Sequence, residues 1–119
     1  METREAILDL QYSEKMKSGL IIGINLLELL ATVKDEAEAS GGRKVLVWYL
    51  EGLLRELRVA QNVMGLDHYV ELERKLMEII GRIQLSLFED VLRSFSEALS
   101  LATTSCQSAM NHLIEKRLI

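Results

Sequence analysis

The chain has 119 residues, a net charge of −4 and no proline. This length suits one domain, which we expect to span residues 1–119. Because proline breaks helices, its absence beside abundant Leu, Glu, Ala, Lys and Arg predicts a chain that is helical almost throughout. No run of basic residues is longer than two, which argues against nucleic-acid binding, since that depends on clustered Lys and Arg.

The mean hydropathy of +0.12 is high for a small helical monomer. The surplus of Leu and Ile predicts a second buried face and therefore a homodimer. Cys106 is the one cysteine in the sequence, which excludes an intrachain disulfide and favours a reducing, cytoplasmic location. The most apolar run, residues 20–33, is shorter than the roughly 20 residues of a membrane span, so we expect no membrane segment.

The first segment predicts a long helix over Thr3–Ala39 that ends at a turn formed by Gly41 and Gly42. From Leu20 onward this helix is apolar nearly all round, except for a narrow polar stripe. The stripe contains Asn25, Glu28 and Thr32 at spacings of three and four. The acidic residues close to the expected end of the helix oppose its dipole, which predicts a frayed last turn.

The second predicted helix covers Lys44–Met64 and has two apolar faces. One is a seam with alternating spacings of four and three, as in a packed helix pair; it contains Leu46, Leu50, Leu53 and Leu57. The other contains Val45, Trp48, Gly52 and Val59. Gly65 suits the position just past a helix end, and Asp67 suits an N-cap for the next helix.

The third predicted helix covers His68–Gln84. The sequence from Ser86 to Glu89 has the form of a capping box, which predicts a break followed by a fourth helix over Leu87–Lys116. Thr103–Ser105 could interrupt that helix. We therefore predict an all-α bundle of four antiparallel helices with long first and last helices, and five helices as the alternative.

Potential catalytic residues are few. His68 and His112 suit surface or capping positions, and Cys106 falls at core spacing, where it acts as a small hydrophobe. We therefore predict no catalytic residue, cofactor or metal site. The alternative is a small enzyme or ligand-binding protein that holds a metal–nucleotide complex near Asn25, Glu28 and Thr32; otherwise this stripe faces water.

The aromatic residues of the second helix suggest an interaction surface. Consecutive residues on a helix point about 100° apart, so Val47–Leu50 cannot all enter one core. We assign the interface to Leu46, Trp48, Tyr49, Leu50, Leu53 and Leu57. The function we predict is a non-enzymatic interaction or assembly module that forms a homodimer, with a different protein as the alternative partner.

Overall fold

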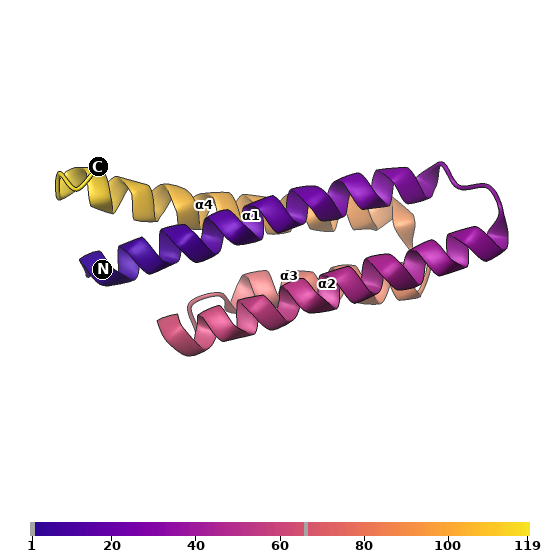
Figure 1. Cartoon of the computed structure of the whole chain (residues 1–119), viewed down its shortest axis with the longest axis horizontal. Coiled ribbons are helices and arrows are strands. Elements are labelled where there is room, and N and C mark those ends of the chain that lie inside the picture. Colours follow the sequence, from indigo (N-terminus) through magenta and orange to yellow (C-terminus); the bar gives the residue numbers. More distant parts are fainter. Residues whose placement is uncertain (1, 66) are drawn as a thin grey trace.

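The computed structural model describes residues 2–65 and 67–119, and this part of the chain forms four α-helices and no strand. The helices are α1 (Thr3–Ala31), α2 (Glu36–Met64), α3 (Val70–Gln84) and α4 (Phe88–Glu115). The chain turns back at each connection, so that the helices lie along one long axis (Figure 1). The molecule measures 54 × 23 × 18 Å. The expected all-α bundle is confirmed.

Each helix packs against two neighbours, in the order α1–α2–α3–α4 and back to α1. Within the described residues no Cα atoms of the diagonal pairs, α1 with α3 and α2 with α4, lie within 8 Å of each other. The space between the helices is filled mainly by aliphatic side chains and the ring of Phe95, because each helix turns one apolar stripe inward. Leu20, Leu50, Leu76 and Phe95 are fully buried, one from each helix.

The break between the first two helices lies earlier than the sequence predicted. α1 ends at Ala31 instead of Ala39, and Gly41 and Gly42 lie inside α2. The carboxylate of Asp35 caps α2 by accepting a hydrogen bond from the Glu38 backbone N–H at 3.0 Å. The acidic residues therefore lie at a helix N-terminus, where the dipole favours them.

One of the two adjacent glycines inside α2 lies close to α1. A Cβ atom at Gly42 would lie 2.7 Å from Leu30 Cδ1. The pair of glycines, which we interpreted as a turn, is thus partly explained by helix packing at position 42.

The other predicted boundaries have mixed outcomes. α2 ends at Met64, and Gly65 adopts a positive φ of 117° as its C-cap, as expected. α3 begins at Val70 instead of His68, so Asp67 is not its N-cap. The break near Ser86 exists, but its side chain does not cap α4; Ser86 itself has a φ of 59°.

α4 is one continuous helix from Phe88 to Glu115. Thr103–Ser105, which the sequence left open as an interruption, lie within it. The small buried residues of α4, Ala98, Ala102 and Ala109, are compatible with its close packing against α1.

Candidate functional site

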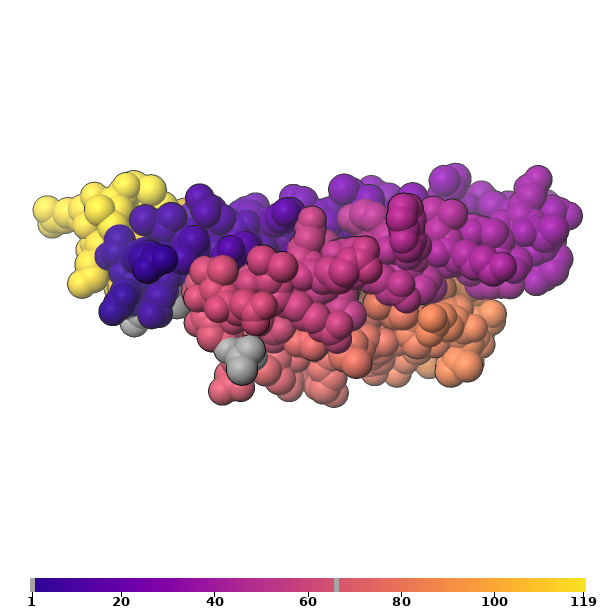
Figure 2. All heavy atoms as spheres, turned by 60° about the horizontal axis from the view of Figure 1, so that its bottom comes forward, coloured from indigo at the N-terminus to yellow at the C-terminus, as the bar shows by residue number. Residues whose placement is uncertain are grey.

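A broad apolar groove runs between α1 and α2 on the outside of the bundle. Its volume is about 830 Å³, and α1 lines it with Ile22 and Leu26. From α2, Trp48 stands beside the groove with 71% of its surface exposed, and Val45 and Val59 are 60% and 57% exposed. Figure 2 shows α1 and α2 side by side along this face. Exposed apolar side chains gathered along one groove occur at interaction sites.

Charged residues of both signs border the groove. Lys15 on α1 lies 3.3 Å from Glu56 on α2, and both side chains are about half exposed. Arg55 also lines the groove. The Tyr49 hydroxyl donates a hydrogen bond to the Gly19 carbonyl at 2.8 Å, and burial, followed by the charge of Glu56, raises the pKa of Tyr49. The groove therefore combines apolar side chains with charged groups of both signs, as protein–protein interfaces do.

The predicted interface residues divide into two groups. Leu46, Leu50, Leu53 and Leu57 are at most 5% exposed and pack in the core of the single chain. They are therefore not available as an outer contact, apart from the part of Leu53 that forms the groove floor. Trp48 and Tyr49 border the groove, so the aromatic pair is the outward part of the predicted set.

The second predicted site does not assemble a pocket. Asn25 and Glu28 are exposed on α1, and Thr32 is exposed just past its end, as the C-cap. Thr32 Oγ1 donates a hydrogen bond to the Leu29 carbonyl at 2.7 Å and so serves the end of its own helix. Among residues 2–65 and 67–119, no three His, Cys, Asp or Glu side chains lie close enough together to hold a metal ion.

A buried polar cluster lies between α1, α4 and the α2–α3 connection, and the sequence analysis missed it. Asp9 on α1 is 1% exposed. Its Oδ1 accepts hydrogen bonds from the hydroxyls of Tyr69 at 2.6 Å and Ser105 at 2.7 Å. His68 Nε2 lies 3.1 Å from the same oxygen. His68, which we expected at a surface or cap, is exposed and also contacts this buried carboxylate.

The cluster continues toward the thiol of Cys106. This thiol donates a hydrogen bond to Ser13 Oγ at 3.1 Å, and the Ser13 hydroxyl donates to the Asp9 carbonyl. Burial raises the pKa of Cys106 and keeps the thiol protonated near neutral pH. Burial and the hydrogen bond to Asp9 likewise raise the pKa of Tyr69.

These contacts favour a structural role for the cluster. The hydroxyls of Tyr69 and Ser105 each donate a hydrogen bond to Asp9. Neither hydroxyl is therefore arranged to act as a base. The raised pKa of Cys106 is the opposite of what an activated nucleophile needs. The arrangement joins three parts of the chain around one carboxylate.

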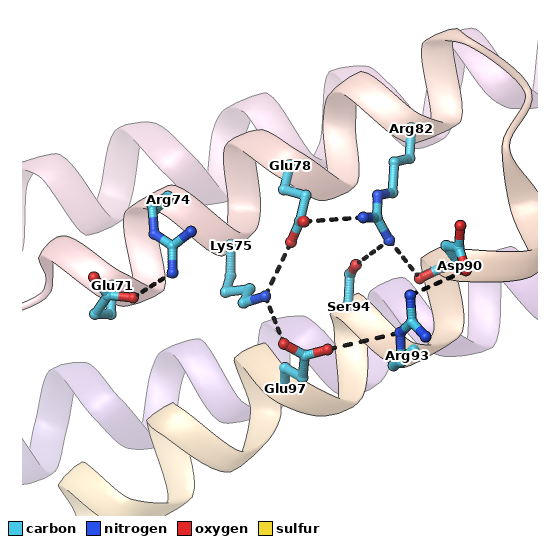
Figure 3. A network of polar contacts seen from close by, with 9 residues as sticks. All are labelled: Glu71, Arg74, Lys75, Glu78, Arg82, Asp90, Arg93, Ser94 and Glu97. Atoms are coloured by element: carbon cyan, nitrogen blue, oxygen red, sulfur yellow. Dashed lines mark hydrogen bonds and ion pairs between the residues drawn. The ribbon is translucent and has the colours of Figure 1, made fainter.

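A second polar network joins α3 to α4 on the surface (Figure 3). Lys75 on α3 contacts Glu97 on α4 at 2.5 Å and Glu78 on its own helix at 3.1 Å. Arg82 reaches Glu78 and the Ser94 hydroxyl of α4. The hydrogen bonds to Glu97 and Glu78 raise the pKa of Lys75, while the hydrogen bond from Lys75 lowers that of Glu78. This network aligns α3 with α4.

In the described residues no helix is both long and apolar enough to cross a membrane. The sequence matches no model of a known protein family, and neither a curated protein nor a solved structure resembles it closely enough to count as a match.

Proposed function

We propose that this chain is a non-enzymatic assembly module that forms a homodimer through the groove between α1 and α2. The observation that carries the proposal is the exposure of Trp48, which is 71% exposed beside an apolar groove of about 830 Å³. Tryptophan is enriched among the residues that dominate binding energy at interfaces. A tryptophan and two valines exposed along one helix face are better explained by a partner than by water.

Charge supports a second copy as the partner. The groove carries Lys15, Arg55 and Glu56, so both signs occur on one face. A two-fold axis brings a surface against itself, and a surface with both signs can then place cations opposite anions. A face with charges of only one sign would repel a second copy, whereas this groove carries charges of both signs.

Substitution of Trp48 tests the proposal. In Trp48→Glu a charge replaces the central apolar side chain, and we expect the dimer dissociation constant to rise by about thirtyfold or more, as for an interface hot spot. Sedimentation velocity at micromolar concentration measures the change. The matched control is Leu92→Glu, because Leu92 on α4 is also an exposed apolar residue, 46% exposed, but does not line the groove.

We expect Leu92→Glu to leave the association unchanged. Circular dichroism should show the native helix content in both variants, since both positions are on the surface. If Trp48→Glu sedimented as the native chain does, the assignment of the groove as the interface would be wrong.

A further inference from the structure

On the groove face of α2, residues lie at matching distances on both sides of Gly52. Residues three, four and seven positions away on either side share the face of a helical residue. The N-terminal side carries an aromatic pair, the C-terminal side carries a charged pair, and a valine follows at each end. In chain order the six residues are Val45, Trp48, Tyr49, Arg55, Glu56 and Val59, and all of them line the groove.

From this pattern we propose that two copies pair antiparallel along α2, with the two-fold axis passing beside Gly52. The inference rests on the homodimer proposed above and adds its direction and register. In this arrangement each residue of α2 faces the residue at the same distance from Gly52 on the opposite side.

The antiparallel register brings together side chains that attract one another. Val45 faces the partner's Val59, which joins two apolar side chains. Trp48 faces the partner's Glu56, whose carboxylate is an acceptor for the indole N–H, and Tyr49 faces the partner's Arg55. A guanidinium over an aromatic ring is a favourable contact at interfaces. Because the axis repeats every contact, each of these pairs occurs twice.

A parallel pairing in the same register would keep valine against valine but lose the contact between Tyr49 and the partner's Arg55. It would place Arg55 against the partner's Arg55 and Glu56 against the partner's Glu56, and like charges in contact are unfavourable. The charge pattern therefore selects the antiparallel direction.

Gly52 lies at the centre, where the two helices would come closest. A Cβ atom at Gly52 would touch only the Arg55 side chain of its own chain, at 3.7 Å. Packing within the chain therefore does not require a glycine at this position, although glycine in a helix costs about 1 kcal/mol relative to alanine. The absence of a side chain at Gly52 allows the backbone of a second copy to approach closely.

Disulfide cross-linking in the full chain tests the direction and register. The native chain is the background control, because its one thiol, Cys106, is 7% exposed. Under mild oxidation we expect Gly52→Cys to cross-link with itself. We expect a mixture of Val45→Cys and Val59→Cys to form a covalent heterodimer.

Each valine variant alone is the matched control. In the antiparallel dimer two copies of residue 45 lie about 21 Å apart along the helix axis, whereas a disulfide needs Cα atoms within about 7 Å. Neither variant should therefore cross-link with itself. All three positions are on the outer face of α2, and circular dichroism checks that the variants retain their helices.

Gly52→Leu gives a second, independent measurement. Leucine favours the helix more than glycine does, so the variant should fold at least as well as the native chain. Its side chain blocks the close approach, and we expect the dimer dissociation constant to rise at least about tenfold, a change that sedimentation resolves.

The outcomes separate this inference from the proposed function. Self-linking of Val45→Cys, or unchanged association of Gly52→Leu, in a chain that remains dimeric would overturn the antiparallel register and leave the homodimer standing. A monomeric native chain without cross-links would overturn both and would mean that a second copy does not cover this groove.

Discussion

At the scale of single residues, the carboxylate of Asp9 organises one end of the bundle. It is 1% exposed and accepts hydrogen bonds from Tyr69 on the α2–α3 connection and Ser105 on α4. A buried charge is tolerated only when hydrogen bonds or an opposite charge compensate its lost hydration. Each donor to Asp9 therefore contributes to stability.

Tyr69→Phe tests that contribution. The substitution removes the 2.6 Å hydrogen bond to Asp9 and keeps the ring. Hydrogen bonds to charged groups contribute about 1.5–3 kcal/mol, so we expect the free energy of unfolding to fall by about that amount. Urea denaturation at fixed protein concentration measures it.

Tyr12→Phe is the control for this prediction. Tyr12 is a half-buried tyrosine packed against the same core, and its hydroxyl is not among the donors to Asp9. We expect a change within about 0.5 kcal/mol for this variant. Equal losses in the two variants would show that the Asp9 contact adds no stability.

The Asp9 cluster could have been found only in part from the sequence. Ala6, Asp9, Ser13, Met16 and Leu20 follow alternating spacings of three and four, which places Asp9 and Ser13 on the core side of α1. That signal indicates burial. It does not indicate the donors, because His68, Tyr69 and Ser105 are distant in sequence and only the packing of the helices brings them to Asp9.

At the scale of helices, glycines mark where α1 is tightly packed. A Cβ atom at Gly23 would lie 2.8 Å from Cε1 of the fully buried Phe95 ring. At Gly19 the nearest atom is Leu53 Cδ1, the end of a flexible side chain. The ring cannot move aside as easily as the leucine methyl group, so Gly23 is the more constrained position.

Gly23→Ala and Gly41→Ala form a matched pair. Alanine favours the helix by about 1 kcal/mol at both positions. Overpacking costs about 1–3 kcal/mol at position 23, so we expect Gly23→Ala to lower the free energy of unfolding. At Gly41 nothing lies within 4 Å of the new Cβ, and we expect that variant to be more stable than the native chain.

Thermal and urea unfolding of both variants measure these changes. A stabilised Gly23→Ala would contradict the close contact with Phe95. A destabilised Gly41→Ala would contradict the placement of this residue inside α2.

The helices themselves were largely predictable, whereas several of their boundaries were not. Helix periodicity and the absence of proline predicted the bundle, and Gly65 correctly marked the end of α2. Gly41 and Gly42 were wrongly interpreted as the first turn, because a glycine also permits close packing and the sequence does not distinguish the two uses. The acidic residues Asp35, Glu36 and Glu38 were the better signal, since they suit a helix start.

At the scale of the whole molecule, the ion network of α3 and α4 makes stability depend on pH. The pKa of Glu78 is lowered from 4.5, so its contribution is present above that value and is lost as the pH falls through the folded-state pKa. The pKa of Lys75 is raised from 10.5, so its contribution is present below that value and is lost as the pH rises through the folded-state pKa.

We therefore expect the free energy of unfolding to be highest between these two ordinary values and to fall on both sides. Urea denaturation over a pH series measures the curve. Lys75→Gln should reduce the fall at alkaline pH and also weaken the acid-side dependence contributed by Glu78. A variant with the native curve would contradict the coupling between α3 and α4.

The self-association that we propose likewise belongs to the scale of the whole molecule, and the sequence suggested it through the amount of apolar surface. The seam of leucines turned out to form the chain's own core, so the interface we propose comes from the other face of α2. Both apolar faces of α2 were visible in the sequence pattern. Only the arrangement of α1 beside α2 showed which face remains outside.

Sedimentation equilibrium of the native chain over a range of micromolar concentrations tests the central claim most directly. The account predicts a mass that rises with concentration toward twice the 13.5 kDa of one chain. A mass that stays at 13.5 kDa at every concentration, with the helices intact, would contradict it.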